Sequence, residues 1–203
     1  MLIEIDPQRP RPRQIKQVAD VIRRGGVVIY PTDTCYGLGA DIFNKKAIEK
    51  ICRIKGLPRN TPFSFVCSDL SDISRYARVS DYAYRILKRF LPGPYTFVLE
   101  GSRQVPKMML TKRKTAGIRI PDHPVCMLLA RELGNPIIST SASVGDEIIS
   151  DPREIKNSLG RHVDVVVDSG IIPPRPSSVV SLVGDEPEVI REGQGDCSLF
   201  YET

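Results

Sequence analysis

The chain has 203 residues, of which 41% are hydrophobic and 26% are charged, an ordinary balance for a globular protein with a sizeable core. No apolar run approaches the ~20 residues that cross a bilayer, and the first residues lack the charged and apolar regions of a signal peptide, so we expect a cytoplasmic protein with no membrane partner. The formal net charge of +5 favours anionic partners such as nucleotides or RNA, although charge alone does not separate a polymer from a single nucleotide.

The predicted elements alternate between helices and strands from the start of the chain. Apolar residues at helical spacing over residues 15–22 predict a helix that ends at Gly25 and Gly26. Residues 27–30 form an almost continuous apolar run, which indicates a strand that is buried on both faces. Further helices are expected where apolar residues recur at helical spacing, at residues 47–54, 71–76, 80–90, 124–133 and 151–159. Further strands are expected at residues 63–67, 95–99, 116–120, 136–140, 163–167, 178–183 and 189–190.

The order of these elements predicts the fold class. Helices and strands interleave over most of the chain, which indicates an α/β fold with a mixed sheet that is richer in strands towards the C-terminus. No repeat, low-complexity block or long linker divides the sequence, so residues 1–203 are expected to form a single domain. Residues 107–114 are a basic segment whose structure the pattern leaves undefined, and Met108, Met109 and Leu110 are its expected anchors.

Cysteine and histidine usage argues against a metal centre. The five cysteines are widely and irregularly spaced, no C-x-x-C pair occurs, and the chain has only two histidines. We therefore expect neither a structural zinc site nor a disulfide framework. Cys52 and Cys67 lie among apolar neighbours and are predicted to be small core residues.

The stretch YPTDTCYGLG at residues 30–39 is the first candidate for a site. It follows the apolar strand at residues 27–30 and combines hydroxyl groups, a carboxylate and two glycines. Hydroxyls can bind a polar ligand, and glycines let backbone N–H groups approach it closely. The same residue types also make ordinary turns, so the stretch on its own leaves both interpretations open.

Polar residues also stand at the ends of several other predicted elements. In an α/β sheet, ligands usually lie outside the strand ends, so these positions can converge on one cleft. Arginine and lysine among hydroxyl groups suit carboxylate and phosphate ligands. Taken singly, each could instead be solvated or bonded to local backbone. The positions are Thr32, Thr34, Lys55, Thr115, Arg119, Ser139, Thr140, Ser141, Ser143, Ser177, Ser178 and Arg191.

Several familiar catalytic patterns are absent from the sequence. It contains no P-loop, no G-x-S-x-G elbow and no G-x-G-x-x-G fingerprint. A nucleophile pair of Cys35 and His123 is conceivable, but the diagnostic spacing for covalent catalysis is missing.

Seven short motifs together carry a family resemblance. They are YPTDTCYGLG (30–39), KGLP (55–58), PGPYTFVL (92–99), GIRIPDHP (117–124), STSAS (139–143), PSSVVSL (176–182) and IREG (190–193). In this order, over about residues 15–195, the sequence resembles the YrdC-like family, which contains the threonylcarbamoyl-AMP synthases of tRNA modification, and within it the YciO-type branch of single-domain proteins. The resemblance implies a twisted α/β fold around a deep, electropositive cavity.

The resemblance also implies a reaction and roles for the matching residues. L-threonine, bicarbonate and ATP would give threonylcarbamoyl-AMP and pyrophosphate with the help of Mg²⁺, and the product would serve the N6-threonylcarbamoylation of adenosine 37 in tRNA. The residues implied to bind threonine are Thr34, Arg119, Ser139 and Ser177. The residues implied to bind ATP are Lys55, Thr115, Ser141 and Arg191. Lys55 and Arg119 would be the catalytic pair, by positioning the substrates and stabilising the phosphoryl charge.

Three positions depart from the family pattern. The arginine of the K-x-R-P motif is Leu57, an asparagine three residues after the proline is Thr61, and the asparagine of S-x-N is Ser143. Each lost charge-assisted hydrogen bond costs about 1.5–3 kcal/mol of binding. The departures leave a weak synthase, an enzyme with another acyl acceptor and a hydrolase of the same adenylate as open interpretations.

A binding protein is the second functional class that the sequence allows. Members of the resembled family have been described as binding double-stranded RNA. Here the basic residues of such a surface would be Lys107, Lys112, Arg113 and Lys114. The two functions are compatible, because an enzyme of a tRNA pathway can also contact tRNA or other members of a modification complex.

Overall fold

The computed structural model describes residues 1–59 and 61–201. Its helices are α1 (Pro12–Arg23), α2 (Lys45–Ile54), α3 (Leu70–Tyr76), α4 (Asp81–Phe90), α5 (Pro124–Leu133) and α6 (Pro152–Leu159), with short 3₁₀ turns η1 (Lys107–Met109) and η2 (Ser198–Phe200). Its strands are β1 (Leu2–Glu4), β2 (Val28–Tyr30), β3 (Gly37–Gly39), β4 (Ser64–Val66), β5 (Ala77–Arg78), β6 (Tyr95–Gly101), β7 (Thr115–Arg119), β8 (Ile137–Ser141), β9 (Ser143–Val144), β10 (Glu147–Ile148), β11 (Val165–Asp168), β12 (Ser178–Ser181) and β13 (Glu188–Arg191).

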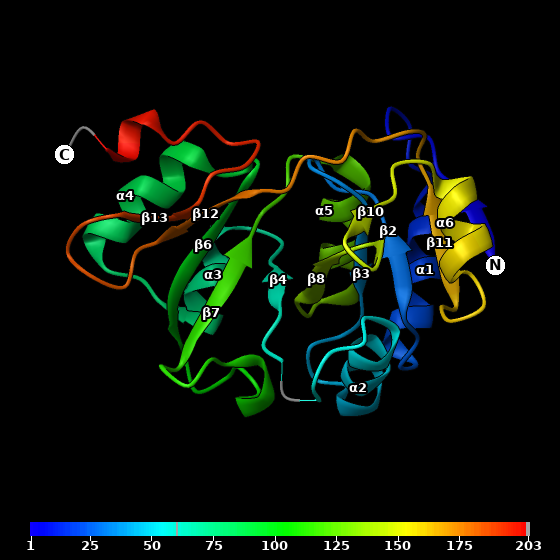
Figure 1. Ribbon diagram of the computed structural model, residues 1–203, viewed down its shortest axis with the longest axis horizontal. Coiled ribbons are helices and arrows are strands. Elements are labelled where there is room, and N and C mark those ends of the chain that lie inside the picture. Colours follow the sequence, from blue (N-terminus) through cyan, green and yellow to red (C-terminus); the bar gives the residue numbers. More distant parts are fainter. Residues whose placement is uncertain (60, 202–203) are drawn as a thin grey trace.

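One large, twisted mixed sheet organises the fold, in the order β1-β11-β2-β3-β8-β4-β7-β6-β12-β13, with β5 paired to β6. Strand β4 lies between the two halves, because it pairs antiparallel with β8 on one side and parallel with β7 on the other. Figure 1 shows β2, β3, β8 and β11 in one half and β6, β7 and β12 in the other. The prediction of an α/β fold with a mixed sheet is confirmed.

Strand β2 shows why an almost continuous apolar run forms the centre of its half. Val28 and Tyr30 pack on one face of the sheet with α1 and α5, whereas Ile29 packs on the other face with α2. All three side chains are buried. The predicted burial on both faces is therefore confirmed, and it follows from helices that cover both sides of a sheet.

Local signals place the helix ends as predicted. Gly25, with a φ of +87°, follows the last turn of α1 in the left-handed conformation that glycine adopts easily. The side chains of Ser80 and Asp151 accept hydrogen bonds from Ala83 N (3.2 Å) and Arg153 N (2.8 Å) at the starts of α4 and α6. Proline occupies the first turns of α5 and α6.

The short strands β1, β3, β5, β9 and β10 were outside the predictions. Gly37 and Gly39 have low strand propensity, but β3 needs them because it lies against the Tyr30 ring: a Cβ on Gly39 would stand 2.5 Å from Tyr30 Cε1 and 2.6 Å from Ile138 O. The Tyr30 hydroxyl donates to Ile138 O across this strand (2.8 Å). The last part of the predicted loop 30–39 is therefore a strand that tertiary packing selects.

Other expectations concern the core and the basic segment. Cys52 and Cys67 are fully buried, which confirms them as core residues, and all five cysteines are free thiols. Met109 is buried within residues 107–114, and Met108 and Leu110 pack against the same core, as predicted. Among residues 1–59 and 61–201, no helix is long and apolar enough to span a membrane.

Candidate functional site

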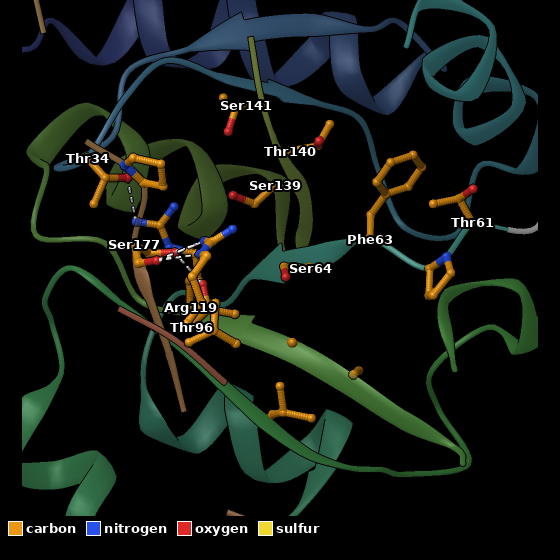
Figure 2. A pocket seen from close by; sticks show the side chains of 18 of the residues that line it. Thr34, Thr61, Phe63, Ser64, Thr96, Arg119, Ser139, Thr140, Ser141 and Ser177 are labelled. Atoms are coloured by element: carbon orange, nitrogen blue, oxygen red, sulfur yellow. Dashed lines mark hydrogen bonds between the residues drawn. The ribbon is translucent and has the colours of Figure 1, made fainter. Parts of the chain in front are cut away.

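A cavity of about 420 Å³ opens where the two halves of the sheet meet. Its wall combines the β2–β3 loop and β8 from one half with β4, β6, β7 and β12 from the other. Figure 2 shows Thr34, Arg119 and Ser177 gathered at one end and Thr61 and Phe63 at the other. The predicted site residues that line the cavity are Thr32, Thr34, Thr115, Arg119, Ser139, Thr140, Ser141, Ser177 and Arg191.

Thr32 and Thr34 shape the β2–β3 loop. The Thr32 hydroxyl accepts hydrogen bonds from Thr34 N and Cys35 N, both at 3.2 Å, and it lies 3.1 Å from the Thr34 hydroxyl. Both threonines are buried. The loop is therefore held in one conformation by its own side chains, and the Thr34 hydroxyl is fixed at the cavity wall.

Arg119, at the end of β7, is the most buried cation of the site. Its Nη2 donates to Asp33 Oδ1 (2.9 Å) and to Thr34 Oγ1 (3.0 Å). The side chains of Arg119 and Asp33 are only 6% and 9% exposed. Burial raises the pKa of Asp33 above its ordinary value, and the neighbouring guanidinium opposes that rise. The Arg119 Nε is buried and has no hydrogen-bond partner in the described chain.

Ser177 and Arg191 form a second polar group, at the same end of the cavity as Thr34 and Arg119. The Ser177 hydroxyl lies 2.8 Å from the Thr96 hydroxyl, and Arg191 Nη2 donates to Ser177 O at 2.8 Å. Ser177 and Thr96 are buried, whereas Arg191 is exposed at its far side. Strands β6 and β12 run parallel here, with Ser178 opposite Tyr95, which brings these side chains together.

Lys55 is placed differently from the other predicted site residues. It follows α2 and stands behind the cavity wall, where its Nζ donates to Ser141 O (3.0 Å) and to Ser143 Oγ. Burial lowers the pKa of Lys55 from its ordinary value. The ammonium is therefore anchored to the end of β8 rather than directed into the cavity.

Comparisons with known proteins agree with this geometry. The Sua5/YciO/YrdC family, described as telomere recombination, matches residues 20–193. The uncharacterized protein YciO of Escherichia coli is 44% identical over 199 residues, covering 97% of each chain, and its crystal structure superposes with a TM-score of 0.93 at 42% identity over 98% of each chain. The chain belongs to this family.

Two further family members carry a named activity or ligand. The threonylcarbamoyl-AMP synthase of Vibrio vulnificus is 31% identical over 157 residues, or 75% of this chain and 84% of the relative. P. abyssi Sua5, whose crystal structure holds L-threonine, superposes with a TM-score of 0.89 at 28% identity and is matched over 95% of this chain and 57% of its own. The Sua5/YciO/YrdC family thus includes threonylcarbamoyl-AMP synthases.

The three departures from the family pattern all lie at or near the cavity. Leu57 and Thr61 line it, and Leu57 is 38% exposed. Ser143 lies behind the wall as a partner of Lys55. Figure 2 shows Thr61 at the end of the cavity opposite Arg119.

The structure also bears on the Cys35–His123 pair and adds two residues to the site. Cys35 lines the cavity, with Sγ 3.8 Å from Ser141 Oγ, but His123 does not, so the conceivable Cys35–His123 pair is not assembled in the described chain. Asp33 and Thr96 are site residues that the sequence interpretation did not select. A polar Thr96 inside the apolar strand 95–99 was the available signal for one of them.

His123 provides a test of the electrostatics beside the site. Burial lowers its pKa to about 4, so the folded protein favours the neutral ring. Because this pKa is below that of the unfolded chain, the stabilisation is present above about pH 6.5 and is lost as the pH falls towards 4. Between pH 7 and 4, we expect the wild type to lose about 2 kcal/mol of unfolding free energy more than His123→Asn.

Urea denaturation at several pH values measures this difference. Parallel stability curves for the wild type and His123→Asn would show that the neutral ring is not favoured by the fold.

Proposed function

We propose that this protein is an enzyme of the threonylcarbamoyl-AMP synthase type, which converts L-threonine, bicarbonate and ATP into threonylcarbamoyl-AMP and pyrophosphate. The observation that carries the proposal is a single cavity lined by two arginines and several hydroxyl groups: Arg119, Arg191, Thr34, Thr115, Ser139, Ser141 and Ser177. Such a cavity can hold a carboxylate and a phosphate ester next to each other. The L-threonine complex of P. abyssi Sua5 supports threonine as a ligand of this family.

The amino acid would bind at the Arg119 end. Arg119 lines the cavity and its guanidinium would attract the threonine carboxylate, while Nη2 stays with Asp33 and Thr34. Ser139 and Ser177 line the cavity nearby and offer hydroxyls to the amino acid. A charge-assisted pair in a buried site gives both affinity and orientation.

ATP would bind along Thr115, Ser141 and Arg191, with Lys55 close behind the wall. Lys55 Nζ lies next to Ser141, so a rotamer change that releases Ser143 would bring the ammonium to a phosphate. Lysine acts on phosphates as a mobile point charge, which suits this role. The described lining of the cavity contains no Asp or Glu, so it does not form a protein cage for Mg²⁺.

The reaction needs no protein nucleophile. The threonine amine becomes a carbamate by taking up bicarbonate with loss of water, and a carbamate oxygen attacks the α-phosphorus of ATP as pyrophosphate leaves. The enzyme's task is then to position the two reactants and to stabilise the phosphoryl charge with Lys55 and the arginines.

The biological setting follows from these substrates. The product would serve N6-threonylcarbamoylation of adenosine 37 in tRNA, which implies work in the cytoplasm and contact with tRNA or with other modification proteins. Because one cavity takes residues from both halves of the sheet, we propose that residues 1–203 act as one YrdC-like domain.

Double-stranded RNA or tRNA binding is a second function with support of its own. Lys112, Arg113 and Lys114 are exposed in the turn between Thr111 and Thr115, which both line the cavity, and Lys107 is exposed nearby. A cationic rim next to the site fits a polyanion, whose affinity rests on phosphate contacts.

The central test is release of pyrophosphate from ATP on addition of threonine and bicarbonate. We expect release to depend on L-threonine, and we expect Arg119→Ala to lower kcat/KM for threonine about 100-fold, since it removes a charge-assisted carboxylate contact and leaves Asp33 unpaired. Arg131→Ala, an exposed arginine on α5, is the matched control and should leave the rate unchanged. Release that ignores threonine would exclude this reaction.

The departures from the family pattern allow a gain-of-function test. The triple variant Leu57→Arg, Thr61→Asn and Ser143→Asn restores polar groups at and behind the cavity wall. We expect it to lower the KM for ATP about tenfold or more, because each restored charge-assisted bond contributes about 1.5–3 kcal/mol. An unchanged or higher KM in a folded triple variant would indicate that the chain acts on a related adenylate instead.

A further inference from the structure

A second cavity, of about 520 Å³, lies between the end of α2 and the loop that joins α6 to β11. We call it the α2 cavity. Four of its five lining residues are basic, and none of the five lines the cavity that holds Arg119. The proposed reaction therefore makes no use of this cluster. The lining residues are Lys50, Arg53, Ile54, Arg161 and His162.

An ion pair holds the two sides of the α2 cavity together. Lys50 Nζ donates to Asp164 Oδ2 (2.9 Å), and the same oxygen accepts from Val27 N (2.8 Å). Asp164 follows His162 by two positions, so the pair joins α2 to the loop that carries the other two basic residues. The two side chains are 34% and 45% exposed, so the pair adds little stability and acts mainly by fixing geometry.

Two guanidinium groups of the α2 cavity carry charge that no acidic residue offsets. Arg53 and Arg161 are both exposed, and neither forms an ion pair within residues 1–59 and 61–201. The nearby carboxylate of Asp164 is already paired with Lys50. Arg53 lies in the last turn of α2, where a cation suits the helix dipole, but that interaction leaves its N–H donors available. Each guanidinium therefore presents a planar set of donors to the solvent.

This set of groups suits a particular class of ligand. Guanidinium groups match the oxygen geometry of phosphate, and lysine and histidine add further donors beside them. The volume is that of a small-molecule site rather than of a single ion. Because Arg53 and Arg161 come from different elements, a ligand that contacts both needs more than one anionic group.

We propose that the α2 cavity is a second phosphate site, which takes a ligand with two or more phosphate groups at Arg53 and Arg161, with His162 beside them. The site is separate from the cationic rim at residues 107–114, which joins β6 to β7 in the other half of the molecule (Figure 1). It is also independent of the proposed reaction, because neither arginine lines the catalytic cavity.

NMR of the histidine rings during a titration with tripolyphosphate tests the proposal at the site itself. The chain has only two histidines, and His162 lines the α2 cavity whereas His123 lines neither cavity. We expect the His162 signals to move and saturate, and the His123 signals to serve as an internal reference. The double variant Arg53→Gln with Arg161→Gln should weaken this binding about tenfold or more, because two charge-assisted contacts are lost.

The double variant Arg85→Gln with Arg131→Gln is the matched control, since it removes the same charge from exposed arginines of α4 and α5. It should keep the wild-type affinity at His162. An equal loss in this control would overturn the proposal, because it would reduce the effect to net charge. Pyrophosphate release from ATP should be unchanged in both double variants, so a failure here is distinct from a failure of the proposed reaction.

A short RNA duplex at the same phosphate concentration identifies the source of the phosphate groups. Saturation of the His162 signals by the duplex at lower concentration, with a steep dependence on salt, would assign the site to a polymer. Equal or tighter binding of tripolyphosphate would assign it to a free ligand. Signals that saturate with neither probe, and drift only as they do with sodium chloride of equal ionic strength, would overturn the proposal.

Discussion

The buried contact of Arg119 with Asp33 and Thr34 connects the two halves of this fold at its site. Arg119 ends β7 in one half, and Asp33 and Thr34 belong to the β2–β3 loop of the other. A buried ion pair of this kind adds little net stability, because desolvation offsets most of the attraction. Its value lies in geometry: it fixes the plane of a guanidinium and the position of a hydroxyl at the wall of one cavity.

The rest of the site can be understood from that fixed end. The cavity wall also carries the polar Ser139, Ser177 and Thr115 and the apolar Leu57, Met109 and Phe63. The other two cations of the site are more exposed than Arg119: Arg191 is exposed, and Lys55 is held by Ser141 O and Ser143.

Sequence patterns predicted the elements whose structure depends on residues that are close in the chain. The run at residues 27–30 became a strand buried on both faces, and the cap residues Ser80 and Asp151 start helices as their side chains dictate. Polar residues at strand ends converge on one cavity because the sheet brings those ends together. Strand β3 could not be foreseen, since its glycines are required by the Tyr30 ring, a tertiary contact.

The same limit applies to individual site residues. Asp33 stands between Thr32 and Thr34 in the sequence, yet nothing local reveals that its partner is 86 positions away at Arg119. Likewise Lys55 was expected at the ligand, but a contact across 88 positions with Ser143 directs its ammonium to the cavity wall. Long-range electrostatic partners of this kind emerge only from the assembled sheet.

The central claim is that one cavity holds an amino acid and a nucleotide together, with the amino acid at the Arg119 end. The most direct measurement is calorimetric titration of L-threonine into the protein, alone and at a saturating concentration of a non-hydrolysable ATP analogue. We expect one threonine per chain in both titrations, with an affinity that the nucleotide leaves intact or improves. Loss of threonine binding in the presence of the nucleotide, or no threonine binding at all, would contradict it.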